Sequence, residues 1–494
     1  MSISFRNVFL AACTLMLAAD AALSQDPTGR FEPVRVKIER LLVEQKIPSI
    51  SVAVAENGKI VWEEGFGFAD RERRVRATPR TSYNIGSTSK PITATALMML
   101  GEQGKLKFDS PANEYLAAPA QLRSSFGDVD RVTVRRLLDH TSGLSRHSQM
   151  LIGDEIAGSA STDETVARYG VLTKPAGEAF EYSNLNYALL SHIVSRVSGK
   201  PFDKFLDDSV FEPLAMRSSY SELPRRSAAT GYYPDGSPLA AVLSDTPGAA
   251  DVYSSVHDLL LFGMFHLGTR PTGGRSILTD SSLAEMKRGS SARGAARYGL
   301  GWESIDIGKY KLVYHHGSNG YGTSIFFMVP ERRIVISILT NITTGHVQGI
   351  ADDILGVLIP DYAAELTSFR QGSRREETSP YLPSAEYLGH WKGTIRTWRE
   401  EIPVEMFFQP DGDVQIQLRG QYRSLLNGVR FEDGYLRGSF QSNIGTPDAN
   451  RHRYNLHLKL KLRDGGRLDG AITSSSTDPT GNVLSSLIQL VKDR

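Results

Sequence analysis

In the first two thirds of the chain, the pattern of apolar and polar residues predicts β-strands near the beginning and near the end. Residues 50–55 and 59–62 flank Asn57-Gly58, a dipeptide typical of a two-residue hairpin turn. Segments between the early and the late strands have the apolar periodicity of an α-helix, as at residues 258–265. Later strands are predicted at 311–314, 324–329 and 334–339. This order predicts an α+β fold, an antiparallel sheet flanked by helices with an all-helical region, in which the sheet joins both ends.

The pattern changes after residue 365. Residues 366–383 are polar and rich in Gly, Ser, Arg and Glu, which is typical of a linker. Residues 384–494 contain only short strand and turn signals, and apolar and polar residues alternate from Leu456 to Leu462. We therefore expect a main domain at 25–365 and a small all-β domain at 384–494, an antiparallel barrel or sandwich.

The first residues have the features of an export signal. Arg6 precedes an apolar run at 8–17, and small residues at Ala22 and Ser24 suit a signal peptidase, which predicts a signal peptide at 1–24. The protein is then periplasmic or secreted. Cys13 offers a minor alternative, because residues 10–13 resemble a lipoprotein cleavage box. No later run approaches the ~18 apolar residues of a membrane span.

Composition excludes several classes of protein. The 494 residues carry a net charge of +1, so nothing indicates a nucleic acid as partner. Cys13 is the single cysteine, so a processed chain has no disulfide and no thiolate metal site. His-Glu-x-x-His and Gly-x-Ser-x-Gly motifs are absent from the sequence. We expect neither a metal nor a cofactor.

Ser87 and Lys90 are the first candidates for chemistry. They lie three residues apart at the start of a segment rich in Ala, Leu and Met, which reads as a helix start, so both side chains lie on one helix face. A serine hydroxyl needs a neighbouring base to become a nucleophile, and a buried amine can serve. The helix start adds N–H groups for a developing oxyanion. The pair alone is also compatible with a helix cap beside a solvated lysine.

Two further clusters fit a serine nucleophile. Tyr182 and Asn184 lie two residues apart after a glycine turn, and a phenol can relay protons while an amide holds a carbonyl. Residues 315–318 (His315, His316, Gly317, Ser318) come directly before a predicted strand, where a backbone N–H can help to bind an oxyanion.

With these three motifs the sequence resembles the serine β-lactamase-related penicillin-recognising enzymes: class C β-lactamases, D-alanyl-D-alanine carboxypeptidases and family VIII-type esterases. The motifs are Ser-x-x-Lys at 87–90, Tyr-Ser-Asn at 182–184 and His-His-Gly at 315–317. Other stretches typical of the family lie around them, including 137–144 and 298–302. The resemblance covers about residues 30–345 and implies a β-lactamase/transpeptidase-like fold.

The resemblance also implies roles for these residues. Ser87 would attack a carbonyl and form an acyl-enzyme, and Lys90 and Tyr182 would share the work of general base, without a ranking between them. Asn184 would contact Lys90 and the substrate. Backbone N–H groups of Ser87 and Ser318 would bind the oxyanion, and Gly317 would let substrate approach the strand. The partner is then a small molecule or peptide with an ester, amide or β-lactam carbonyl.

One motif departs from the β-lactamase pattern. Where β-lactamases usually have Lys-Thr-Gly, this chain has His315-His316-Gly317. His315 has the better spacing as counterpart of the lysine, and His316 remains an alternative. A histidine is mostly neutral at pH 7, so it holds a substrate carboxylate less well than lysine does. This favours esters, amides or D-amino-acid peptides. The alternatives are a true β-lactamase and a slowly deacylating penicillin-binding or sensor module.

Overall fold

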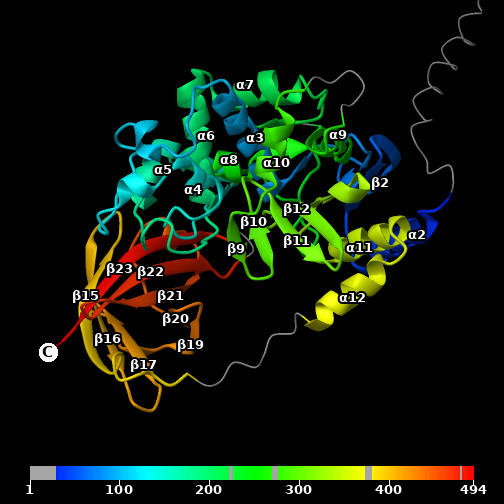
Figure 1. The fold of residues 1–494 in the computed structure, drawn as a ribbon. Helices are drawn as coiled ribbons and strands as arrows, with labels where there is room; N and C mark the ends of the chain where they lie inside the picture. Colours follow the sequence, from blue (N-terminus) through cyan, green and yellow to red (C-terminus); the bar gives the residue numbers. More distant parts are fainter. Residues whose placement is uncertain are drawn as a thin grey trace, which may run out of the picture.

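The computed structural model describes residues 29–221, 225, 227–269, 276–372, 381–478 and 481–493. Two parts follow each other along the chain (Figure 1), and we call residues 29–372 the main body and residues 381–493 the C-terminal barrel. The predicted signal peptide at 1–24, with Cys13, lies outside the described residues. So do residues 373–380 of the predicted linker. Within the described ranges no helix is both long and apolar enough to cross a membrane.

The main body is built on one antiparallel nine-stranded sheet in the order β3-β2-β1-β14-β13-β12-β11-β10-β9. Its strands are β1 (Ser49–Glu56), β2 (Lys59–Asp70), β3 (Val75–Arg76), β9 (Ser291–Arg293), β10 (Ala296–Tyr298), β11 (Glu303–Ile307), β12 (Tyr310–Ser318), β13 (Thr323–Val329) and β14 (Ile334–Thr340). The hairpin predicted at Asn57-Gly58 joins β1 to β2. Strand β1 pairs along its other edge with β14, with Ile50 opposite Thr340, so strands from both ends of the main body meet in the sheet, as predicted.

Both faces of the sheet are covered, because neighbouring residues of each strand pack into different cores. Val52 and Val54 on β1 join one apolar cluster, while Ala53 and Ala55 join the other. The first cluster lies under α2 (Glu32–Glu44), α11 (His346–Leu358) and α12 (Tyr362–Gly372), at the right of Figure 1. This burial on two sides explains why β1 is apolar almost throughout.

The other face carries the all-helical region. Its longer helices are α3 (Ser89–Glu102), α5 (Thr162–Tyr169), α6 (Asn184–Ser198), α9 (Val256–His266) and α10 (Asp280–Met286). Shorter pieces are a 3₁₀ turn η1 (Gly86–Thr88), α4 (Val134–Leu138), α7 (Phe202–Leu206), a π-helical turn η5 (Asp207–Phe211) and α8 (Pro247–Ala250). Small sheets join β4 (Tyr83–Asn84) with β8 (Val252–Ser254) and β6 (Tyr220–Ser221), and β5 (Met150–Ile152) with β7 (Val242–Ser244).

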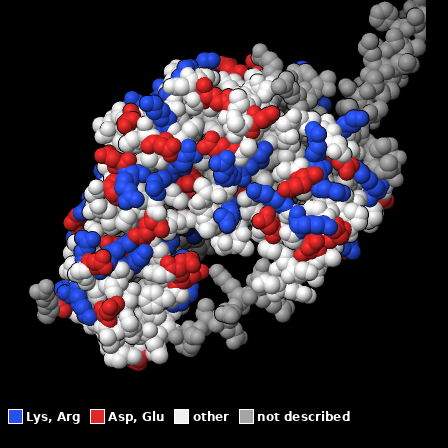
Figure 2. Space-filling view, viewed as in Figure 1, with Lys and Arg blue, Asp and Glu red and all other residues white. Residues whose placement is uncertain are grey.

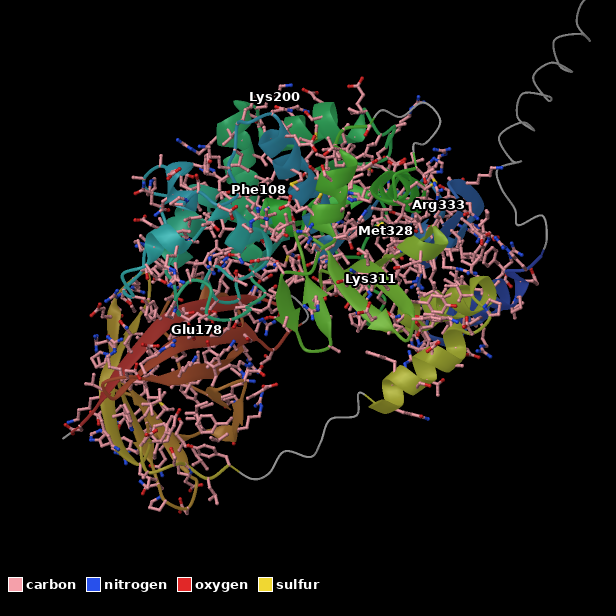
Figure 3. All side chains as sticks on the ribbon, in the orientation of Figure 1. Phe108, Glu178, Lys200, Lys311, Met328 and Arg333 are labelled. Carbon is pink, nitrogen blue, oxygen red and sulfur yellow. The ribbon has the colours of Figure 1, made fainter. Side chains whose placement is uncertain are left out.

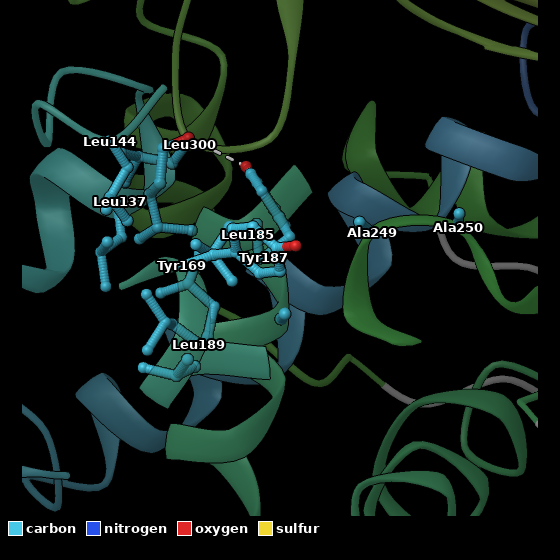
Figure 4. Packing of buried hydrophobic residues seen from close by; sticks show 14 of the residues in the cluster. Leu137, Leu144, Tyr169, Leu185, Tyr187, Leu189, Ala249, Ala250 and Leu300 are labelled. Carbon is cyan, nitrogen blue, oxygen red and sulfur yellow. Dashed lines mark hydrogen bonds between the residues drawn. The ribbon is translucent and has the colours of Figure 1, made fainter. Parts of the chain in front are cut away.

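The apolar face of α6 fixes the position of this region. Leu185 and Leu189 on α6 pack with Leu137 of α4 in the core shown in Figure 4. Tyr187 is also fully buried there, and its hydroxyl donates to the carbonyl oxygen of Leu138 at 2.9 Å. Helix α6 ends where Gly199 takes a left-handed conformation, as its sequence predicts.

The C-terminal barrel is a second antiparallel sheet of nine strands that curls into a nearly closed barrel (Figure 1). Its strands are β15 (Gly389–Arg396), β16 (Glu401–Phe408), β17 (Val414–Leu418), β18 (Ser424–Leu425), β19 (Asn427–Glu432), β20 (Tyr435–Phe440), β21 (Tyr454–Arg463), β22 (Arg467–Ser476) and β23 (Val483–Lys492). Alternate residues of β21, such as Leu456 and Leu458, are buried inside, so the predicted all-β fold is confirmed.

One boundary differs from the expectation. The polar composition after residue 365 predicts a linker from 366, but residues 366–372 continue helix α12. Leu366 and Phe369 pack against the apolar cluster beneath α11, and this tertiary contact outweighs the polar composition.

Candidate active site

Ser87 lies in the 3₁₀ turn η1, directly before α3, and this turn is pressed against strand β12. A Cβ atom on Gly317 would lie only 2.0 Å from the carbonyl oxygen of Ile85, so only glycine allows the strand to come this close. Gly86 has a φ of +52°, and a Cβ there would lie 3.1 Å from the backbone nitrogen of Ser318. The backbone around Ser87 therefore touches the third motif directly.

Hydroxyl groups fasten η1 to the sheet. Ser324 Oγ on β13 donates to the carbonyl oxygen of Ile85 at 2.7 Å, and it also lies 2.7 Å from Thr88 Oγ1. Ser89 Oγ donates to the carbonyl oxygen of Gly86 at 2.7 Å. These contacts are buried, where a hydrogen bond that is broken costs about 1–3 kcal/mol. They fix the residues on both sides of Ser87.

Lys90 connects the first two motifs. Its Nζ donates to Ser87 Oγ at 3.0 Å, to Asn184 Oδ1 at 2.8 Å and to the carbonyl oxygen of Ala249 at 3.1 Å. The Lys90 side chain is fully buried, whereas Ser87 is partly exposed. The Lys90 amine is thus shielded from water while the Ser87 hydroxyl that it touches faces the open cavity.

The three partners of Lys90 suit both of its protonation states. Asn184 Oδ1 and the Ala249 carbonyl oxygen can only accept hydrogen bonds, whereas the Ser87 hydroxyl can donate or accept. A charged ammonium donates to all three. A neutral amine can donate to the two carbonyl oxygens and accept the hydroxyl proton of Ser87. The site can therefore carry Lys90 as a base.

Tyr182 lies beside this pair. The Nζ of Lys90 is 4.7 Å from the centre of the Tyr182 ring, and the ring of His140 lies 4.5 Å away from it on another side. Ser87 and Tyr182 line a cavity of about 680 Å³ together with residues 314–318 of β12 and Ala296 of β10. The structure thus brings the serine, the lysine and the tyrosine to one place.

The two histidines of the third motif point to different surroundings. His315 is buried, and its Nε2 lies 3.1 Å from the hydroxyl of Tyr298, while its ring centre is 6.4 Å from that of Tyr182. The ring of His316 packs instead against Tyr314 and Phe327. Because β12 alternates its side chains, His315 is the residue that faces the tyrosines of the site.

Two hydrogen bonds hold the ring of His315. Its Nδ1 donates to the carbonyl oxygen of His316 at 2.8 Å, and its Nε2 lies 3.1 Å from the hydroxyl of Tyr298, which can donate or accept. Burial raises the pKa of Tyr298 well above its usual value, helped by the neighbouring Tyr187 and Tyr182, so this phenol keeps its proton. Both ring nitrogens of His315 are thus engaged within the protein.

The edge of β12 beside Ser87 is open. Strand β11 pairs with β12 only up to Tyr314, whereas β13 continues to pair with it up to Ser318. Among the described residues no strand occupies the remaining edge at 315–318. An extended substrate can add to such an edge through its backbone.

Sequence reasoning missed three groups at this site. The carbonyl oxygen of Ala249 cannot be found from a side-chain motif. Tyr298 and His140 lie in two stretches that are typical of the family, 298–302 and 137–144, but the sequence indicates no role for either ring. In the part of the chain that the structure describes, no three His, Cys, Asp or Glu residues form a group that could hold a metal.

Comparisons with known proteins agree with this geometry. The Beta-lactamase family model matches residues 34–359. Protein flp of Staphylococcus aureus (strain N315) is 28% identical over 328 residues, which cover 64% of this chain and 64% of that protein. The chain therefore matches just under two thirds of the length of that relative.

Solved structures show the same fold. The octameric penicillin-binding protein homologue from Pyrococcus abyssi aligns with a TM-score of 0.58 and 23% identity, over 94% of this chain and 100% of that chain. A class C beta-lactamase aligns with a TM-score of 0.57 and 20% identity, over 72% of this chain and 99% of the other. The first similarity extends over nearly the whole chain, whereas the second leaves more than a quarter of it unmatched.

Proposed function

Because the chain belongs to the beta-lactamase family of serine hydrolases, we propose that it is an exported hydrolase in which Ser87 forms an acyl-enzyme with esters, amides or D-amino-acid peptides. One observation carries this proposal: Lys90 Nζ contacts both Ser87 Oγ and Asn184 Oδ1 inside the fold. Export rests on the sequence of residues 1–24 alone.

The proposed acylation begins with Lys90 in its neutral form. Lys90, with Tyr182 as a proton relay, takes the hydroxyl proton while Ser87 Oγ bonds to the substrate carbonyl carbon. The carbonyl oxygen becomes an oxyanion, bound by the backbone N–H groups of Ser87 and Ser318. When the tetrahedral intermediate collapses, the leaving group departs with that proton. Water then attacks the acyl-enzyme and releases the acid.

Asn184 has a positioning part in this scheme. Its Oδ1 accepts from Lys90, which fixes the amide plane and leaves the amide NH₂ group as a donor. We propose that this NH₂ group holds the carbonyl of the substrate amide or ester. The open edge of β12 at 315–318 would bind the substrate backbone on the opposite side of Ser87.

The third motif supports esters and peptides over β-lactams. A lysine at position 315 would hold a substrate carboxylate with a permanent charge, whereas His315 uses both ring nitrogens within the protein. We therefore propose slow β-lactam turnover at most. A long-lived penicillin acyl-enzyme, as in a binding or sensor module, is the second candidate, because the nucleophile and its lysine are in contact whichever substrate arrives.

The test is intact mass spectrometry of the mature protein mixed with a fluorophosphonate or, separately, with a penicillin. We expect a fluorophosphonate adduct that disappears in the Ser87→Ala variant. A lasting penicillin adduct on Ser87 indicates slow deacylation, and a turnover assay identifies rapid β-lactam hydrolysis where no adduct remains. A Ser281→Ala variant, which removes an exposed hydroxyl at the start of α10, is the control for nucleophile identity. A lack of labelling with both reagents would contradict the proposal.

A further inference from the structure

We propose that a positively charged groove between the main body and the C-terminal barrel binds the carboxylate groups of extended substrates, such as acidic peptides. This inference rests on the proposed function, since it names a substrate class for the same site. The groove is a cavity of about 570 Å³. Its walls are Ser145 and Arg146 of the main body, Glu181 beside the second motif, and strands β19 to β22 of the barrel.

Basic side chains outnumber acidic ones in this groove. Five basic residues line it, and Glu181 is the single acid among the described lining residues: Arg146, Arg430, Arg437, His457 and Lys459. Behind them, Glu432 forms ion pairs with Arg437 at 3.1 Å and with Arg430 at 3.5 Å. Asp433 adds a longer contact to Arg437 at 4.0 Å, and with Arg146 and Lys459 the groove still has more positive than negative charge.

Arg146 is the most available of these cations. Its side chain is exposed, and among the described residues no carboxylate pairs with it. It lies close enough to His457, together with Arg430, for their charges to help lower the pKa of that histidine, where burial is the main cause. Arginines of both parts of the molecule thus converge on the same space.

The chemistry of the groove favours carboxylates. Three of its basic residues already hold a carboxylate: Lys459 pairs with Glu181, and both Arg430 and Arg437 pair with Glu432. Arginine presents a planar set of donors that matches both oxygens of a carboxylate. A second acid entering the groove therefore meets donors of a suitable kind, and Arg146 has no carboxylate partner among the described residues.

The groove is next to the candidate active site. Glu181 lines the groove, and the following residue, Tyr182, lines the cavity that contains Ser87. Adjacent Cα atoms are about 3.8 Å apart, so neighbouring residues of one short segment line the two spaces. An extended substrate with its reactive carbonyl at Ser87 can thus place an acidic group in the groove. Binding there selects acidic substrates over neutral ones.

The first experiment measures binding without catalysis. Calorimetry with the full-length mature Ser87→Ala protein compares hexa-D-glutamate, hexa-D-glutamine and inorganic tripolyphosphate. We expect hexa-D-glutamate to bind and hexa-D-glutamine not to bind. The double variant Arg146→Ala/Arg430→Ala should weaken the acidic peptide at least about tenfold, because charge-assisted hydrogen bonds are lost. Tripolyphosphate binding without hexa-D-glutamate binding would overturn the assignment of a carboxylate ligand.

The matched control removes the same charge elsewhere. Arg332 and Arg451 are exposed arginines, one in each part of the molecule, and neither lines the groove. Arg332→Ala/Arg451→Ala should leave the affinity unchanged. An equal loss in both double variants would mean that net charge alone attracts the peptide, and it would overturn the proposal. So would equal binding of the acidic and the neutral peptide.

A second experiment tests whether the groove affects the turnover of ester substrates. For ester substrates with acidic or neutral acyl tails and the same leaving group, Arg146→Ala/Arg430→Ala in the active enzyme should raise KM for the acidic tail alone. If no ester is hydrolysed, the proposed function fails while calorimetry still decides whether the groove binds carboxylates. If esters are hydrolysed with equal preference in both proteins, the groove proposal fails by itself.

Discussion

Lys90 is an ionisable side chain without exposure to solvent, and such a residue persists only where its partners compensate for the lost hydration. Three oxygens and the rings of Tyr182 and Tyr187 surround its Nζ. The same contacts that make burial tolerable also aim the amine at Ser87. At this residue, stability and proposed chemistry depend on the same atoms.

The variant Lys90→Met tests whether both the stability of the fold and the proposed chemistry depend on the Lys90 amine. Methionine keeps the length of the side chain but cannot accept a proton, so we expect acylation by a fluorophosphonate or an activated ester to slow by about 10²–10⁴-fold. Stopped-flow or quenched measurements of acylation give this rate.

Folding must be followed in the same variant. Loss of the amine leaves Asn184 Oδ1 and the Ala249 carbonyl oxygen without this donor, so the free energy of unfolding should fall by about 1–3 kcal/mol. Lys105→Met, at an exposed lysine just after α3, should change neither quantity. An unchanged acylation rate in Lys90→Met would show that another group is the base.

Individual residues of the site could be predicted to different degrees from the sequence. Ser87 and Lys90 are three residues apart on one helix start, and local geometry alone brings them together. Tyr182 and His315 are far away in sequence. Their side-chain chemistry made them candidates, and the resemblance to a family implied their roles. The choice between His315 and His316 needed the alternation of β12. The Ala249 carbonyl could not be predicted, because any residue has one.

At the scale of elements, the contact between η1 and β12 holds the site together. Gly317 lies between the Ile85 carbonyl oxygen and Ser324 Oγ, and an added Cβ would be 2.0 Å from the first and 2.4 Å from the second. Neither atom can move alone, because the two are hydrogen-bonded to each other. Any larger residue must therefore separate the turn from the strand.

Gly317→Ala should consequently disable the enzyme. Moving η1 away from β12 displaces Ser87 from the Ser318 N–H, and a shift of about 1 Å is sufficient for a loss on the order of 10²-fold in kcat/KM. Steady-state kinetics on an ester measures the loss. Gly356→Ala on α11, where an added Cβ meets nothing within 4 Å, is the control and should keep full activity. Normal activity of Gly317→Ala would disprove this role of the contact.

Element prediction succeeded where short-range signals are strong. The hairpin at Asn57-Gly58 follows from local chemistry, because this dipeptide favours a two-residue turn between strands. The continuation of α12 through 366–372 did not follow, since only two apolar residues, Leu366 and Phe369, hold that polar segment to the core. Helices of this kind are decided by tertiary packing.

At the scale of the whole molecule, partly buried ion pairs join the C-terminal barrel to the segment before Tyr182. Glu178, labelled at the junction in Figure 3, pairs with Arg463 of β21 and accepts from Tyr435. Glu181 pairs with Lys174 of the main body and Lys459 of β21. Because two carboxylates hold these pairs, we expect the junction to be sensitive to pH. Elsewhere, charges of both signs are interspersed over the face in Figure 2.

Acid should weaken this junction through Glu181. Burial by itself would raise the pKa of Glu181, but the charges of Lys174 and Lys459 outweigh it and lower the pKa from 4.5 to about 2. A lowered carboxyl pKa stabilises the fold above pH 4.5, and this stability is lost as the pH falls toward 2. Its upper limit is about 3 kcal/mol.

Denaturant unfolding from pH 2 to 6 measures this contribution. Glu181→Gln should be less stable than the wild type at pH 6 and should lose less stability on acidification. Glu331→Gln, at an exposed acid of the main body, should follow the wild-type curve. Parallel curves for Glu181→Gln and wild type would contradict the prediction.

The bond between Thr88 and Ser324 joins residues that are 236 positions apart in the chain. During synthesis, the ribosome completes the Ser-x-x-Lys segment long before the strands that hold it exist, and closing so long a loop is slow. A nascent chain therefore carries its nucleophile and its lysine without the strand that would bind the oxyanion. We therefore expect Ser87 of the precursor not to react with substrates until β12 and β13 have been synthesised and folded.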